Sequence, residues 1–193
     1  MFQGVFESAW AGSVLWAALY ISDYALTLSC ARMYGAQTNI VFEGSYEITP
    51  AFQADVDALR RVSPRFVIAL IGSSAYVWVV RQFAGPSTRY FDLYVGVLGA
   101  MVLLQTTVHM RHLRNWFLFA KGASHIQGRL KYSRGLLLRM SALELLLFAG
   151  LYGGLFFVTK SVFCLGGALA CGVLSLKHYR LARRHQAPVA KAA

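Results

Sequence analysis

Five long apolar runs, separated by short charged segments, constrain the fold of this chain more than any other feature. A helix needs about 20 apolar residues to cross a hydrocarbon core of about 30 Å, and each run comes near that length. The runs cover residues 9–31, 66–83, 90–110, 136–158 and 162–179. We therefore predict an all-α fold, a polytopic transmembrane helix bundle of about five spans that fills residues 1–182, with a flexible tail at 183–193.

The composition supports a membrane protein and argues against the soluble classes. Hydrophobic residues make up 57% of the chain and charged residues only 14%, which excludes intrinsic disorder and is unusual for a soluble domain. The formal net charge of +11 could suggest nucleic acid, but the basic residues flank the apolar runs instead of forming a soluble basic motif. We expect the partners to be the lipid bilayer and anionic lipid headgroups, and we expect no nucleic acid.

The distribution of Lys and Arg also predicts an orientation. If the N-terminus lies outside, most basic residues fall on the inner side, and only Arg81, Arg89 and Lys160 lie on the outer side. This agrees with the tendency of cytoplasmic loops to carry an excess of Lys and Arg. We expect an integral protein of a bacterial inner membrane, with its N-terminus outside and its C-terminus in the cytoplasm.

The connections between the runs carry local signals of their own. Residues 34–64 form the largest connection, in which 39–49 alternates around Glu43-Gly44-Ser45 and predicts a small hairpin. Residues 50–62 begin with a proline and place Phe52, Val56 and Leu59 on one face, which predicts a short amphipathic surface helix. Only residues 159–161 separate the last two runs, so we expect a tight helical hairpin there.

Two acidic residues inside the apolar runs are candidates for function. An ionised group at the centre of a bilayer-spanning helix costs at least about 2.5 kcal/mol, so such a residue normally faces protein or a water-filled cavity. Asp23 lies eight residues before the inner end of the first run, and Glu144 lies eight residues after the start of the fourth. At 1.5 Å per residue, both reach a depth of about 12 Å, which permits a shared site.

Polar residues on the third run extend this hypothesis. Gln105, His109 and His112 are spaced by four and three residues, so they share one face of a helix. Arg139, five residues before Glu144, projects from another side of its helix toward headgroups or a carboxylate. A desolvated carboxylate beside an imidazole can exchange a proton near neutral pH. The predicted ligand or proton site consists of Asp23, Glu144, His109, Gln105 and Arg139.

A metal site is a more specific alternative hypothesis for the same region. His109, His112, Asp23 and Glu144 would offer a mixed nitrogen and oxygen ligand set that suits a divalent ion such as zinc, iron or manganese. An isolated His-x-x-His pair is a weak signal, because it lacks the third ligand and the general base of known metalloenzyme motifs. The sequence identifies no catalytic residue and no other cofactor, and it favours a function other than catalysis.

Three functions therefore remain open. The leading hypothesis is a small membrane protein of the transport or channel type, which handles a proton, a cation or a small polar solute at the carboxylate and histidine site. The second is an accessory or assembly subunit of a membrane complex, and the third is a metal-dependent membrane enzyme. Small residues four apart, such as Gly150 and Gly154, let helices approach closely and favour a homo-oligomer or a partner within a membrane complex.

Overall fold

Five long helices make up most of the structure. The computed structural model of the chain describes residues 8–85 and 89–185. The long helices are α2 (Ala9–Ala36), α4 (Pro64–Phe83), α5 (Arg89–Phe117), α6 (Arg134–Thr159) and α7 (Val162–Arg184). All five are long and apolar enough to cross a membrane, and large apolar side chains such as Ile68 and Leu147 are more than two-thirds exposed. The predicted helix bundle is confirmed, and the protein is an integral membrane protein.

Serine side chains mark where three of the helices begin. Ser8, Ser63 and Ser133 precede α2, α4 and α6, and each hydroxyl oxygen accepts a hydrogen bond from the backbone amide three residues later. These bonds satisfy amides that have no partner within the helix. Pro64 follows Ser63 at the first position of α4, where its missing N–H is not needed.

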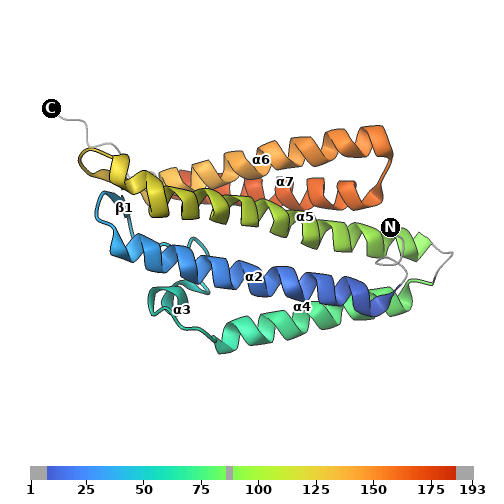
Figure 1. The fold of residues 1–193 in the computed structure, drawn as a ribbon. Helices are drawn as coiled ribbons and strands as arrows, with labels where there is room; N and C mark the ends of the chain where they lie inside the picture. Colours follow the sequence, from blue (N-terminus) through green and yellow to red (C-terminus); the bar gives the residue numbers. More distant parts are fainter. Residues whose placement is uncertain (1–7, 86–88, 186–193) are drawn as a thin grey trace.

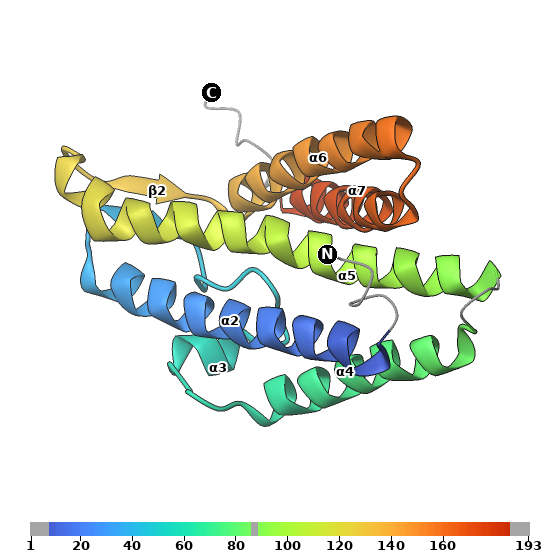
Figure 2. The ribbon, with the colours of Figure 1, turned by 45° about the vertical axis from the view of Figure 1, so that its right-hand side comes forward.

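Helix α5 lies at the centre of the bundle. Helices α2 and α4 pack on one side of it and α6 and α7 on the other, as Figures 1 and 2 show. The helical hairpin predicted between the last two runs is confirmed, because α6 packs closely on α7 and only Lys160 and Ser161 separate them. Lys160 turns the chain with a left-handed backbone conformation at φ 56°.

The short elements gather at one end of the bundle, which we call the connector end (Figure 1). They are α3 (Gln53–Asp57), η1 (Leu118–Gly122), η2 (Ala123–His125), β1 (Ile40–Phe42) and β2 (Leu130–Tyr132). The hairpin predicted within 39–49 does not form, because β1 pairs in parallel with β2 from the connection after α5. Aromatic contacts favour this pairing, since Phe42 packs against Phe119 and Tyr132.

The surface helix predicted over 50–62 is shorter than expected. It is reduced to α3 and ends before Leu59, whose φ of 50° is incompatible with a continuing helix. Asp55 does not belong to the apolar face of this helix, yet it is only 4% exposed. Its carboxylate accepts a hydrogen bond from Ser63 and lies 3.0 Å from the guanidinium of Arg60. These bonds hold α3 and the residues that follow it against the start of α4.

Three helices extend at least five residues further toward the connector end than their apolar runs. Helix α2 continues to Ala36 instead of residue 31, α5 continues to Phe117 instead of residue 110, and α7 continues to Arg184 instead of residue 179. The tail predicted from residue 183 therefore begins within α7. The rest of the predicted tail, residues 186–193, lies outside the described residues.

Candidate functional site

Helix α2 carries a stripe of polar side chains, Trp16, Tyr20, Asp23 and Thr27, that reaches two neighbouring helices. Trp16 donates a hydrogen bond from Nε1 to the hydroxyl of Ser73 on α4, at 2.7 Å. Asp23 and Thr27 lie further along α2 and reach His112 on α5. The stripe thus connects α2 to α4 near one end of the bundle and to α5 nearer the connector end.

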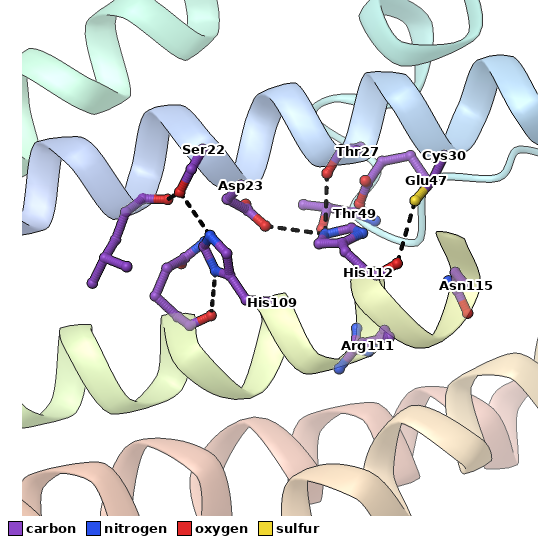
Figure 3. A network of polar contacts seen from close by, with 12 residues as sticks. Ser22, Asp23, Thr27, Cys30, Glu47, Thr49, His109, Arg111, His112 and Asn115 are labelled. Atoms are coloured by element: carbon purple, nitrogen blue, oxygen red, sulfur yellow. Dashed lines mark hydrogen bonds and ion pairs between the residues drawn. The ribbon is translucent and has the colours of Figure 1, made fainter. Parts of the chain in front are cut away.

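Asp23 and His112 form the central contact of the candidate site (Figure 3). Asp23 Oδ1 lies 3.0 Å from His112 Nε2, which is an ion-pair distance, although the approach lacks hydrogen-bond geometry. Thr27 Oγ1 lies 3.1 Å from the same nitrogen. The side chains of His112 and Asp23 are 9% and 22% exposed, so the structure places an acid and an imidazole together in a largely buried position.

His109 lies one turn before His112 and has different partners. Its Nδ1 lies 2.8 Å from the backbone carbonyl of Gln105, and its Nε2 lies 2.7 Å from the hydroxyl of Ser22 on α2. Because a carbonyl oxygen only accepts, Nδ1 carries a proton. Both ring nitrogens of His109 are therefore occupied, Nδ1 by a bond within α5 and Nε2 by the contact that holds α2 against α5, as Figure 3 shows.

A cavity of about 380 Å³ opens beside Asp23 and His112. It lies between α2, α5, the start of α6, the end of α7 and residues 46–56, which belong to the connection between α2 and α4. Its polar lining residues are Tyr20, Asp23, Tyr24, Thr27, Tyr46, Glu47, Thr49, Gln105, Arg111, His112, Asn115, Arg134, Lys177, His178 and His185. Burial raises the pKa of Tyr46 far above its ordinary value, so this residue contributes a neutral hydroxyl, which accepts a hydrogen bond from Asn115.

Besides Asp23, three polar side chains that line this cavity have a buried atom without a hydrogen bond. Gln105 Nε2, His112 Nδ1 and one terminal nitrogen of Arg111 are buried and make no hydrogen bond to the residues that the structure describes. Leaving such a group unpaired costs about 1–3 kcal/mol. All three residues line the cavity with other atoms, whereas these atoms themselves are covered by protein.

Glu144 lies in a separate ion-pair cluster. Its carboxylate binds Arg111 Nε at 3.0 Å and also pairs with Arg114. It is not among the residues that line the cavity. Both acids thus contact α5 at adjacent residues, Asp23 at His112 and Glu144 at Arg111, but adjacent residues of a helix lie about 100° apart around its axis. The structure brings the two acids to the same level and turns them to different faces.

Arg139 does not join either group. It is half-buried on α6, and within residues 8–85 and 89–185 it makes no hydrogen bond or ion pair. The structure therefore brings together Asp23, Gln105 and His112 of the candidate residues, and it leaves Glu144, His109 and Arg139 outside the cavity.

The structure also adds residues that the sequence did not single out. Arg111 is mostly buried and joins the cavity to the Glu144 cluster. His178 lies within α7, near the end of the fifth predicted run, and contacts the hydroxyl of Ser141 at 2.8 Å through Nδ1. Its position inside that run, two residues after Leu176, was the available signal.

The proposed metal ligands do not converge. His112 contacts Asp23, whereas His109 contacts Ser22 and Glu144 contacts two arginines. In the described part of the chain, no group of three or more His, Cys, Asp or Glu side chains is arranged to hold a metal ion.

Comparisons of the chain with protein-family models, with curated proteins and with solved structures find no match.

Proposed function

We propose that this protein belongs to the transport or channel type and handles a proton, a cation or a small polar solute at the cavity beside Asp23 and His112. The observation that carries the proposal is the acid and imidazole, 3.0 Å apart on two different spans, at the wall of a cavity whose lining includes many polar side chains. Ionisable residues within membrane spans commonly mark ion pathways and proton relays. Histidine changes its charge near physiological pH, so this pair can take up and release a proton.

Packing beyond the site favours a gated pathway over an open pore. The buried side chains of Trp16, Val77, Tyr94 and Leu98 fill the space between α2, α4 and α5 away from the connector end. A solute in the cavity would meet this cluster before it reached the other side. Movement through the protein therefore requires α2 to shift against α5. Such a shift would break the Asp23–His112 contact together with the contacts of Thr27 and Ser22 to the two histidines.

Proton movement in liposomes tests this proposal. We expect purified protein in liposomes with a trapped pH-sensitive dye to take up protons under an imposed potential. Asp23→Asn or His112→Gln should lower the initial rate by about 100-fold, because a positioned proton-transfer group contributes at least that much. Sodium- and potassium-sensitive dyes in the same liposomes test whether the protein moves either cation.

Two matched variants control this experiment. Asp92→Asn and His125→Gln change exposed residues of the same types away from the cavity, and both should keep the wild-type rate. The proposal is wrong if the wild-type protein moves none of these ions faster than empty liposomes. It is also wrong if Asp23→Asn and His112→Gln keep the wild-type rate.

A second candidate function, an accessory or assembly subunit, is favoured by one observation on α6. Gly150 and Gly154 are exposed on the same face, and a Cβ atom added at either would meet nothing within 4 Å. Small residues four apart on a lipid-facing surface suit close contact with another helix. The partner is either a second copy of the chain or another membrane protein.

Enlarging this face tests the second candidate. We expect Gly154→Leu to shift the protein from an oligomer to the monomer mass in light scattering after gel filtration in detergent, because leucine would hold two helices apart. Gly72→Leu changes an exposed glycine of α4 with equally open surroundings and should have no effect. If wild-type protein and both variants are monomeric, the α6 face does not form a contact between copies.

A further inference from the structure

A groove runs along α5 and α7 on the surface of the bundle. Its volume is about 720 Å³, and its lining is almost entirely apolar. The residues between its ends are Leu93, Gly96, Val97, Ala100 and Leu104 of α5, with Val162, Leu165, Gly166, Leu169, Ala170, Val173 and Leu174 of α7. Both helices are apolar enough to span a membrane, so the groove faces the hydrocarbon region and suits an acyl chain.

The groove continues into the polar cavity beside Asp23 and His112. Leu174 and Lys177 line both spaces. On α5, residues 93, 97, 100 and 104 line the groove, and residues 108, 111 and 115 line the cavity. Successive members of this set are three or four residues apart, which places them on one face of the helix. One side of α5 is therefore apolar along the membrane and polar at the connector end.

The two ends of the groove carry opposite charges. Asp92 lies at the end away from the connector, and Lys177 lies where the groove meets the cavity. Lys177 is exposed and makes no ion pair with the described residues. Arg111 and Arg134 line the cavity beyond it, and the partly unsatisfied guanidinium of Arg111 is buried there. Asp23 and Glu47 are the acidic lining residues, and Asp23 is already beside His112.

The groove is longer than the hydrocarbon part of one leaflet of a bilayer. Residues 162 and 177 of α7 are separated by about 22 Å at 1.5 Å per residue. Half of a hydrocarbon core of about 30 Å is about 15 Å, so an acyl chain from one leaflet fits within the groove.

We infer that an anionic phospholipid binds here, with one acyl chain in the groove between α5 and α7 and its headgroup beside Lys177 at the mouth of the polar cavity. The apolar groove fits the chain, and the basic residues at one end fit the phosphate. The inference concerns binding alone and holds whether or not the protein transports anything.

Lipid binding by the purified full chain tests the inference. Native mass spectrometry in detergent would compare palmitoyl-oleoyl phosphatidylglycerol with phosphatidylcholine that carries the same chains. We expect tighter binding of phosphatidylglycerol. Lys177→Gln should weaken this binding about fivefold, the effect of one lysine near anionic lipid, without changing phosphatidylcholine binding. Lys160→Gln removes a lysine at the opposite end and should change neither.

The groove itself needs a separate variant. Ala170→Phe should lower the binding of both lipids because the ring would fill the groove, whereas Gly150→Phe on the exposed face of α6 should not. Equal binding of the two lipids by the wild-type protein would overturn the inference. So would equal effects of Lys177→Gln and Lys160→Gln. Displacement of phosphatidylglycerol by an equal concentration of inorganic phosphate would also overturn it, since the chain would then contribute nothing.

Discussion

Gly166→Ala should lower the free energy of unfolding by about 3 kcal/mol, the upper end of the range for overpacking a buried site. Gly166 is buried where α7 crosses α5. A Cβ atom there would collide with the backbone carbonyl of Gly96 and lie 2.9 Å from the amide nitrogen of Ala100. Both obstacles are backbone atoms of a helix, so the two helices would have to separate to admit a methyl group.

The position of Gly172 on the same helix provides the matched control. A Cβ atom at Gly172 would meet nothing within 4 Å. Gly172→Ala should leave the protein as stable as the wild type or stabilise it by up to about 1 kcal/mol, because alanine favours a helix over glycine. Thermal unfolding can be followed with a thiol-reactive dye, since Cys30 and Cys171 are fully buried. Equal melting temperatures for Gly166→Ala and the wild type would show that α5 and α7 do not touch at this point.

The number and positions of the spans could be predicted because each depends on a local run of apolar residues. The ends of α5 and α7 could not be predicted from hydropathy. Arg111, His112 and Asn115 look like the end of a membrane span in the sequence. In the structure, they remain helical and bind Glu144, Asp23 and Tyr46 from other elements. Polar residues extend a helix inside a protein when another segment satisfies them, and the sequence does not show which segment that is.

The strand near residue 40 shows the same limit. Its alternation indicated an extended segment, and β1 does form there. Its partner β2 lies about 90 residues further along the chain, beyond the reach of a local turn signal. The contact of Phe42 with Phe119 and Tyr132 brings these distant segments together.

The depth of the candidate residues along their helices could be predicted from the sequence. The rotation of each helix about its own axis could not. Counting residues from the ends of the apolar runs placed Asp23 and Glu144 at the same level, and they contact neighbouring residues of α5. Which face each acid meets depends on how the helices turn about their axes during packing. Small residues such as Gly96 and Gly166 set that packing between α5 and α7, and spacing alone does not reveal it.

Glu144→Gln should destabilise the protein by about 2 kcal/mol. Glu144 is the acidic partner of Arg111, whose side chain is only 14% exposed, and of Arg114, which is 47% exposed. Removing one member of a fully buried ion pair costs about 3–5 kcal/mol, because the remaining charge stays buried without compensation. The partial exposure of Glu144, at 24%, reduces this cost. Thermal unfolding in detergent would measure the loss.

A double-mutant cycle separates the ion pair from other effects of these substitutions. Arg111→Gln alone should also destabilise the protein. The loss of stability in the double variant Arg111→Gln/Glu144→Gln should be smaller than the sum of the two single losses, by at least about 1 kcal/mol. Glu43→Gln provides a control, because Glu43 is exposed and accepts its hydrogen bond from the backbone of Arg134. Its effect should stay below about 1 kcal/mol.

The Glu144→Gln variant also distinguishes a structural role of Glu144 from a role in transport. Because Glu144 lies outside the cavity, Glu144→Gln that remains folded should keep proton movement in liposomes within about threefold of the wild-type rate, far from the roughly 100-fold loss expected for Asp23→Asn. The opposite result, unchanged stability together with lost proton movement, would mean that Glu144 shares the transport site with Asp23. The helices α5 and α6 would then have to turn relative to each other during the transport cycle.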